Sequence, residues 1–362
     1  MKGSYLCVES STWVRDTHNL FDYDSSDKIP QKMILKVPGS ICRKADVLNF
    51  HPENFSSDCS MIKIYELGNQ FILYPLKHEP LGLIIKTLKK HSTRGYKLSI
   101  GETFKLGRVE MKVKDIVIAS HTPEVIDTIE DSFKVENACR ICFTSNDTKS
   151  NPLVSLCSCT GTLKWMHLRC LQSWTMARSY RKINTYMATY AWTSLECDIC
   201  KDKLPMTFEH QYQIYDLIDL PKHGLNYIIL EDQRKDNYYY IIHILFPQDA
   251  PISIGRGNDN DMKINDISIS RSHASITFNH NFYLKDLNSR FGTIVMLTKP
   301  QPIDKSESLM VQLNRTTIKF SLKTEIHVID CLKNCCKKQN PIHPSPIRNT
   351  LSQLIFDDSN DH

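Results

Sequence analysis

The chain has 362 residues, 41% of them hydrophobic and 23% charged, which is ordinary for a globular protein and long enough for two or three domains. Its net charge is only +5, from 45 basic and 40 acidic residues. The densest basic stretch, Lys77–Lys97, is interrupted by the apolar run Leu81–Ile85, so it is interpreted as a solvated face and we expect no nucleic-acid partner.

The first third of the chain is predicted to be rich in β-structure. Residues 1–30 are polar and acidic, and we expect them to form a loosely ordered N-terminus. Strand-like runs follow, and the alternation of apolar and polar residues over Tyr96–Val113 is typical of a half-buried hairpin. We therefore expect a β-rich domain over residues 31–120 and an acidic linker over residues 121–136.

Seven cysteines and one histidine between Cys139 and Cys200 have the spacing of zinc ligands. A tetrahedral zinc ion takes four thiolate or imidazole ligands, and two ligands separated by two residues can hold one ion from a single turn. Eight ligands predict two structural zinc ions with no open coordination position. A chance scatter of core cysteines would not give four ligand pairs so close in sequence. The pairs are Cys139-x2-Cys142, Cys157-x-Cys159, His167-x2-Cys170 and Cys197-x2-Cys200.

The order and spacing of these pairs, with Trp174 four residues after Cys170, resemble the RING-CH (RING-variant) zinc finger, whose two sites are cross-braced. A PHD finger has the same ligand set, but it usually spaces its second pair by two residues and has Trp where this chain has Leu195. The long interval before Cys197 indicates an insertion around residues 180–190, and we assign the module to residues 137–205. The resemblance implies two sites: Cys139, Cys142, His167 and Cys170 bind one zinc ion, and Cys157, Cys159, Cys197 and Cys200 bind the other.

RING-CH domains act as ubiquitin ligases by docking a ubiquitin-conjugating enzyme charged with ubiquitin, so the resemblance implies a docking surface rather than catalytic residues. Ile141 and Trp174 would form its apolar patch. Lys201 follows the last ligand, where such domains often carry a cation that bridges to ubiquitin. Arginine is commoner there and can donate a forked pair of hydrogen bonds, whereas lysine is a point charge.

After a linker over residues 206–224, a second pattern extends from Ile252 to Thr293. It resembles the FHA (forkhead-associated) domain, a β-sandwich whose loops at one end bind phosphothreonine peptides, and we assign this domain to residues 225–325. The stretch Tyr96–Val113 also resembles the closing strands of such a sandwich, which suggests that residues 31–120 are a degenerate FHA-like domain without a phosphate site. The motifs of the second pattern are Ile-Ser-Ile-Gly-Arg256, Ser270-Arg-Ser-His273 and Asp-Leu-Asn-Ser289-Arg-Phe-Gly-Thr293.

The FHA resemblance implies a site that captures a dianion with a few fixed donors. Arg256 would supply a forked, charge-assisted contact and Ser270 a hydroxyl donor, while Arg271 and Arg290 would add further phosphate contacts. Phe291 departs from the family, because most members have Asn there, donating to the backbone of the bound peptide. An aromatic side chain cannot make that bond, so we expect an altered affinity or peptide preference.

Together these patterns predict a multidomain, mainly β protein: a cross-braced two-zinc RING-CH module followed by an FHA-type β-sandwich, with a β-rich N-terminal domain and a mostly disordered tail over residues 330–362. We expect a ubiquitin-protein ligase whose partners are a conjugating enzyme, ubiquitin and a phosphothreonine-containing protein. The alternative is a phosphopeptide-binding scaffold with a structural zinc module. No apolar run approaches 18 residues and no signal peptide is evident, so we expect a soluble cytoplasmic or nuclear protein without a transmembrane segment.

Overall fold

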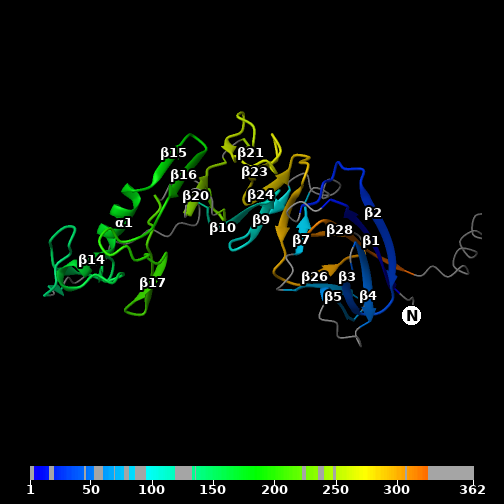
Figure 1. Cartoon of the computed structure of the whole chain (residues 1–362), viewed down its shortest axis with the longest axis horizontal. Helices are drawn as coiled ribbons and strands as arrows, with labels where there is room; N and C mark the ends of the chain where they lie inside the picture. Colours follow the sequence, from blue (N-terminus) through cyan, green and yellow to red (C-terminus); the bar gives the residue numbers. More distant parts are fainter. Residues whose placement is uncertain are drawn as a thin grey trace, which may run out of the picture. The chain divides into compact units, whose positions relative to one another are not determined.

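The computed structural model is mainly β, and its strands form two β-sandwiches and a small cysteine-rich module (Figure 1). Within the described residues there is one α-helix, α1 (Leu168–Ala177), and a short 3-10 helix, η3 (Gly161–Lys164). None of the described helices has the length and apolar character needed to cross a bilayer. The structure describes residues 4–15, 20–44, 46–52, 60–68, 70–76, 81–85, 95–118, 133–134, 136–221, 226–234, 240–247, 250–305 and 308–324.

The first sandwich, here called the N-terminal sandwich, combines strands from both ends of the described chain. Its early strands are β1 (Ser4–Trp13), β2 (Lys28–Leu35), β3 (Gly39–Lys44), β4 (Val47–Pro52), β5 (Ser60–Leu67), β6 (Gln70–Pro75) and β7 (Leu81–Ile84). Its late strands are β26 (Gln301–Ile303), β27 (Leu309–Leu313) and β28 (Thr316–Thr324).

The two sheets of the N-terminal sandwich bury one apolar core between them. One sheet has the order β4-β3-β5-β6-β26, and the other runs β2-β1-β28-β27-β7. Early and late strands share the core, since Leu6, Ile62 and Leu73 pack with Val311 and Phe320, and all five side chains are fully buried. Burying a side chain of this size contributes about 1.5–3 kcal/mol, so the late strands are integral to the sandwich.

The second sandwich, here called the C-terminal sandwich, is also assembled from two distant segments. Its later strands are β19 (Tyr227–Asp232), β20 (Tyr240–Leu245), β21 (Ile252–Gly255), β22 (Met262–Lys263), β23 (Ala274–Phe278), β24 (Phe282–Asp286) and β25 (Thr293–Met296). Its early strands are β8 (Tyr96–Lys97), β9 (Thr103–Leu106) and β10 (Val109–Val117).

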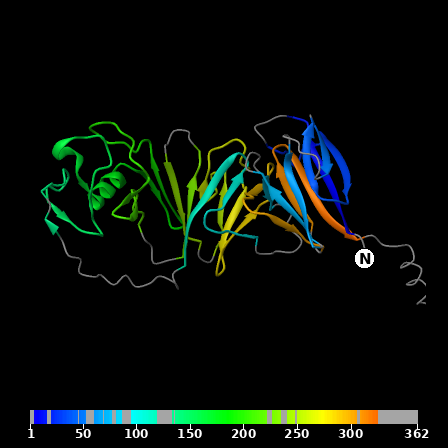
Figure 2. The same ribbon diagram turned by 90° about the horizontal axis from the view of Figure 1, so that it is seen from below.

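The early strands close the C-terminal sandwich by direct pairing. Strand β8 pairs with β24, β9 with β25, and β10 with β19, so the cyan strands lie among the yellow ones in Figures 1 and 2. The alternating residues of Tyr96–Val113 therefore do form a hairpin that closes a sandwich, but its partners are strands of residues 227–296. The apolar side chains on β9 and β10 that enter this core are Phe104, Leu106, Val109, Met111 and Val113, all fully buried.

The two sandwiches share one strand order and have exchanged their last three strands. The sheets β20-β19-β10-β9-β25 and β22-β21-β23-β24-β8 match those of the N-terminal sandwich strand for strand. In each sandwich seven strands follow one another in the sequence, and three come from the other half of the chain. Strands β7 and β25 pair antiparallel, with Ile84 opposite Ile294, and join the sheet β2-β1-β28-β27-β7 to the sheet β20-β19-β10-β9-β25. Residues 31–120 and residues 225–325 therefore each contribute strands to both sandwiches.

The cysteine-rich module lies between β10 and β19 in the sequence and has a small core around Leu153, Met166, Leu171 and Leu217. Besides α1 and η3, the described residues of this module form short strands. They are β11 (Phe133–Lys134), β12 (Asn146–Asp147), β13 (Leu153–Val154), β14 (Met166–His167), β15 (Tyr180–Ile183), β16 (Met187–Trp192), β17 (Thr207–His210) and β18 (Gln213–Asp216).

The insertion predicted around residues 180–190 forms the hairpin β15–β16, which attaches the module to the C-terminal sandwich. Strand β16 pairs along its whole length with the edge strand β20, from Met187 opposite Leu245 to Trp192 opposite Tyr240. The buried indole of Trp192 also donates a 2.9 Å hydrogen bond to the carbonyl of Thr175 at the end of α1. The insertion thus extends the sheet and holds the helix.

Four intervals are predicted from the sequence to lack regular structure. Within residues 1–30, strand β1 is regular and buries Leu6 and Val8, together with the polar side chains of Ser10 and Thr12 that alternate with Cys7, Glu9 and Ser11 along the strand. Residues 206–224 include the hairpin β17–β18. Apart from β11 and the residue just before the module, the linker over 121–136 lies outside the described residues, as does the tail over 330–362.

Candidate functional site

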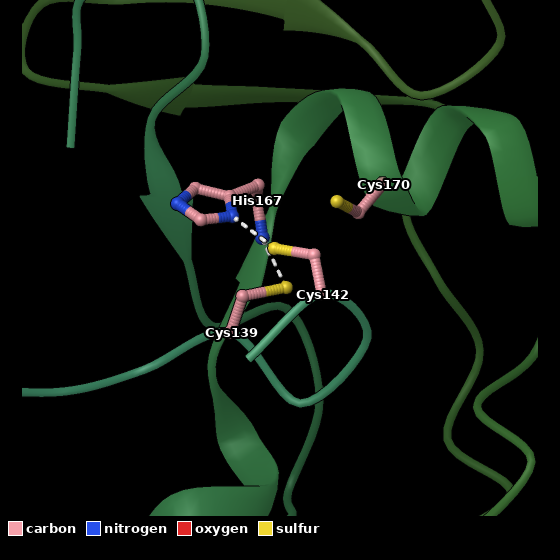
Figure 3. Close-up of side chains that lie close together, drawn as sticks. All are labelled: Cys139, Cys142, His167 and Cys170. Atoms are coloured by element: carbon pink, nitrogen blue, oxygen red, sulfur yellow. Dashed lines mark hydrogen bonds between the residues drawn. The ribbon is translucent and has the colours of Figure 1, made fainter. Parts of the chain in front are cut away.

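The first cluster of candidate metal ligands comprises Cys139, Cys142, His167 and Cys170, whose ligand atoms all lie within 4.8 Å of one another (Figure 3). The helix α1 presents Cys170, and His167 lies at its N-cap. The Nδ1 atom of His167 lies 3.2 Å from the sulfur of Cys142, and its Nε2 lies 2.5 Å from the carbonyl of Asn146. An N–H at Nε2 donating to that carbonyl leaves Nδ1 free to bind metal.

The second cluster comprises Cys157, Cys159, Cys197 and Cys200, again with ligand atoms within 4.8 Å of one another. The structure therefore assembles the two interleaved sets of four that the RING-CH resemblance implied. Both sets fit zinc, because Zn–S bonds of about 2.3 Å place two ligands of one tetrahedral ion about 3.8 Å apart. Four protein ligands fill such a site, so the zinc would stabilise the fold and would not bind substrate.

The first and last ligand pairs sit in turns of the same geometry. In the first, the amide of Phe143 donates to the carbonyl of Cys139 at 2.8 Å; in the last, the amide of Lys201 donates to the carbonyl of Cys197 at 3.0 Å. Both donors have positive φ, 62° and 63°, a conformation that non-glycine residues adopt rarely. This turn directs both sulfurs of each pair to the same point, which is the local requirement for holding one ion.

Arg140 connects the two clusters, a role that ligand spacing alone does not reveal. It lies inside the first pair, yet its guanidinium approaches the sulfur of Cys197 at 3.5 Å and that of Cys159 at 3.6 Å. It also donates to the carbonyl of Leu163 at 2.8 Å. Burial alone would lower the pKa of Arg140, but the thiolates of the second cluster raise it above its usual value. A cation here offsets the excess negative charge of a site with four thiolates.

Apolar side chains lie exposed on both outer turns of the module. Ile141 is 39% exposed, and Ile199 occupies the same place in the last ligand pair and is 53% exposed. The sequence repeats Cys-x-Ile-Cys at both places, a signal for Ile199 that the sequence analysis missed. Trp174 is half-buried against the module core, and the guanidinium of Arg178 lies 4.8 Å above its ring. Arg178 in turn pairs with Asp198, next to Ile199.

The predicted phosphate-binding residues lie on loops of the C-terminal sandwich. The backbone amide of Arg256 donates to the carbonyl of Ser270 at 2.9 Å, and the amide of Arg290 donates to the Ser270 hydroxyl at 3.0 Å. Since that hydroxyl accepts in this bond, it keeps its own hydrogen for donation. The side chains of Arg256, Arg271 and Arg290 are exposed. The Nε of Arg256 donates to the carbonyl of Ile269, next to Ser270, at 3.1 Å.

Two buried polar residues brace these loops. His273 is fully buried; its Nδ1 accepts from the amide of Ser270 at 3.0 Å, and its Nε2 lies 3.1 Å from the carbonyl of Gly292. The carboxylate of Asp286 accepts from Ser289 and from the hydroxyl of Thr293 at 2.8 Å. These buried hydrogen bonds of His273 and Asp286 fix the loops before any ligand arrives.

Arg290 and Phe291 both contact the N-terminal sandwich, which no sequence pattern indicated. The guanidinium of Arg290 donates to one oxygen of Asp22 at 3.0 and 2.7 Å. Burial alone would raise the pKa of the Asp22 carboxyl, but the bonds from Arg290 and from the amide of Asp24 hold it below its usual value. Phe291 lies against Trp13, with ring centroids 6.3 Å apart.

Comparison with protein families identifies both regions. A model of the RING-variant domain matches residues 139–200, which span all eight candidate ligands. A model of the FHA domain matches residues 252–315. The chain contains a RING-variant domain and an FHA domain. The FHA match covers the loops that carry Arg256, Ser270 and Arg290, and it continues into β26 and β27, which the structure places in the N-terminal sandwich.

Several curated proteins resemble part of the chain. E3 ubiquitin-protein ligase MARCHF7 of Pongo abelii is 27% identical over 161 residues, 42% of this chain and 21% of that protein. MARCHF7 of Mus musculus is 33% identical over 106 residues, 27% of this chain and 14% of that protein. Probable E3 ubiquitin-protein ligase MARCHF10 of Homo sapiens is 32% identical over 75 residues, 21% of this chain and 8% of that protein. The chain thus spans about a fifth or less of the length of these relatives. No solved structure matches the chain.

Proposed function

We propose that this protein is a ubiquitin ligase that docks a ubiquitin-conjugating enzyme through its RING-variant domain and recruits phosphothreonine-containing proteins through its FHA domain. The strongest support for this proposal is that all eight candidate ligands of the RING-variant domain are assembled in two sets of four, beneath turns that expose apolar side chains. The similarity to proteins named E3 ubiquitin-protein ligases supports the same conclusion. Metal-binding thiolates require a reducing compartment, so the proposal includes a cytoplasmic or nuclear location.

The docking surface would consist of Ile141, Ile199 and the exposed part of Trp174. Arg178 connects Trp174 to the last turn, because it lies over the Trp174 ring and pairs with Asp198, next to Ile199. Arg140, next to Ile141, contacts the sulfur of Cys197 in the same turn. Lys201 follows the last ligand and is exposed, as a residue that contacts ubiquitin would have to be. The domain would act by holding the charged conjugating enzyme in a reactive geometry, since its zinc ions have no open position.

Replacing Ile141 and Ile199 together by Ala should reduce ubiquitin discharge from the conjugating enzyme by at least tenfold. Each change removes an exposed apolar contact but no zinc ligand and no core side chain, so both ions should stay bound. The matched control is Leu67→Ala, which removes an exposed apolar residue from the N-terminal sandwich. Unchanged discharge by the double variant would place the docking surface elsewhere.

The FHA domain would bind the phosphate of phosphothreonine with Arg256, Ser270 and Arg271, aided by Arg290. Phosphothreonine carries about 1.5 to 2 negative charges at neutral pH, and its oxygens need donors held in place before binding. The brace formed by His273 and Asp286 meets this requirement, because it fixes the loops through buried hydrogen bonds.

Substituting Arg256 with Ala should weaken binding of phosphothreonine peptides by ~1.5–3 kcal/mol, the usual contribution of a hydrogen bond to a charged group. Calorimetric titration of the full chain with a degenerate phosphothreonine peptide pool and with the unphosphorylated pool would measure this loss. Lys263→Ala is a suitable control, because this exposed cation pairs with Asn258 rather than with the Ser270 loop. Equal binding of the two pools by the unmodified chain would defeat the phosphate assignment.

A further inference from the structure

The loop that carries Arg290 and Phe291 is fastened to a segment of the N-terminal sandwich. This segment, residues 20–24, lies between β1 and β2. The amide of Tyr23 donates to the carbonyl of Arg290 at 3.0 Å. Gly292 packs so closely on the Tyr23 ring that an added Cβ would lie 2.7 Å from it. The contact therefore includes backbone, aromatic and charged groups, and it joins residues about 270 positions apart in the sequence.

The ion pair within this contact is strongly asymmetric. The Asp22 side chain is 2% exposed, whereas the Arg290 side chain is 62% exposed. Asp22 directly follows Leu20 and Phe21, which form a small buried cluster with Trp13. Its carboxylate also accepts a 2.9 Å hydrogen bond from the amide of Asp24. A carboxylate held in this way is not a mobile competitor for a phosphate site. It is instead a fixed acceptor beneath an arginine.

The geometry leaves the outer edge of Arg290 available. A guanidinium has five N–H donors in a rigid plane, and Asp22 engages its Nε and one terminal nitrogen with a single oxygen. Because two nitrogens are anchored, the plane has a defined orientation, and its exposed edge lies on the same loop cluster as the Ser270 hydroxyl. An arginine fixed in this way loses less side-chain entropy when it binds an anion.

Phe291 also anchors this loop on the N-terminal sandwich. Its ring packs against Trp13, and the guanidinium of Arg290 lies 5.5 Å from its centroid. The ring is half-buried in the contact with the N-terminal sandwich. Phe291 stands where most FHA domains have an Asn that contacts the bound peptide, and here it contacts the neighbouring sandwich instead.

We propose that the phosphothreonine site is composite: Asp22 of the N-terminal sandwich is a positioning residue that orients Arg290 toward the phosphate, and Phe291 anchors the Arg290 loop on Trp13. This inference rests on the proposed phosphothreonine binding of the FHA domain. It adds that the domain needs the neighbouring sandwich to complete its site, and that Phe291 forms part of the anchor.

The test is titration of the full chain with a degenerate phosphothreonine peptide pool, comparing Asp22→Asn with the unmodified protein. Removing the carboxylate should weaken phosphopeptide binding about tenfold, because Arg290 loses its orientation, while weak binding of the unphosphorylated pool should not change. The matched control is Asp27→Asn. Asp27 lies a few residues after Asp22, and its exposed carboxylate is near Arg15. Arg290→Lys keeps the charge but loses the fork, so it should resemble Asp22→Asn.

A second measurement separates positioning from a purely structural role. In an Arg290→Gln background, Asp22→Asn should cause no further loss of phosphopeptide affinity, since Asp22 acts only through Arg290. Tighter binding by Asp22→Asn would overturn the proposal and make Asp22 a competing anion. Unchanged binding would make the ion pair merely structural. Both results leave the proposed phosphothreonine binding intact. If neither the variants nor the unmodified chain prefers the phosphorylated pool, the proposed binding is overturned, and this inference with it.

Discussion

A fragment containing only residues 225–325 should not fold on its own. It lacks β8, β9 and β10, which supply five fully buried side chains to the core of the C-terminal sandwich. At about 1.5–3 kcal/mol for each side chain, their loss removes about 7–15 kcal/mol, comparable with the whole stability of a domain. The fragment also carries β26–β28, whose apolar faces would have no partner sheet. Circular dichroism and urea titration should show no cooperative unfolding transition.

The control for this experiment keeps the exchanged strands and removes the zinc module. Val117 on β10 lies directly opposite Tyr227 on β19, so residues 119–225 can be replaced by a short glycine–serine turn without separating the strand ends. This shortened chain should unfold cooperatively. A cooperative transition for the fragment of residues 225–325 would show that each half of the chain pairs with its own strands and would contradict the exchange.

Replacing Cys197 by Ser should release one of two zinc ions and unfold the RING-variant domain. Cys197 is fully buried, and its sulfur belongs to the second cluster and contacts Arg140. Zinc binding contributes on the order of 10–16 kcal/mol in small finger peptides, far more than the small core around Leu153 and Leu171 could replace. Elemental analysis should give two zinc ions for the unmodified chain and at most one for the variant.

Cys42→Ser provides the matched control, because Cys42 is equally buried but lies on β3 of the N-terminal sandwich. This variant should keep both zinc ions, whatever its effect on the sandwich. Retention of two ions by Cys197→Ser would show that Cys197 is not a ligand, and a content of one or none in the unmodified chain would overturn the two-site assignment.

The candidate ligands were predictable from sequence because zinc sites use short, regular ligand spacings that can be recognised without knowledge of the fold. The interleaving of the two sets came from the resemblance to RING-CH domains, and the structure brings together the same sets. Arg140 carries no comparable signal, since an arginine within a ligand pair does not reveal which cluster its side chain reaches. Ile199 did carry one, in the repeated Cys-x-Ile-Cys pattern.

The strand exchange lay beyond sequence reasoning for a physical reason. Alternation over Tyr96–Val113 predicts a half-buried hairpin but does not specify the sheet that receives it. Pairing with β19, β24 and β25 depends on contacts between residues more than 100 positions apart. The pairing of Asp22 with Arg290 is of the same kind. Similarly, the insertion around residues 180–190 was visible as extra length, but its pairing with β20 was not.

The most direct test of the proposed ligase function is ubiquitination of a lysine-containing peptide pool by the full chain. The assay uses a panel of conjugating enzymes and compares peptides phosphorylated on threonine with the same peptides unphosphorylated. We expect modification with at least one conjugating enzyme, and faster modification of the phosphorylated pool. Arg256→Ala should lose this advantage, and the variant with both Ile141→Ala and Ile199→Ala should modify either pool at least tenfold more slowly. Equal rates for the two pools would contradict phosphothreonine recruitment. No modification and no ubiquitin discharge with any conjugating enzyme would contradict ligase activity and favour a phosphopeptide-binding scaffold.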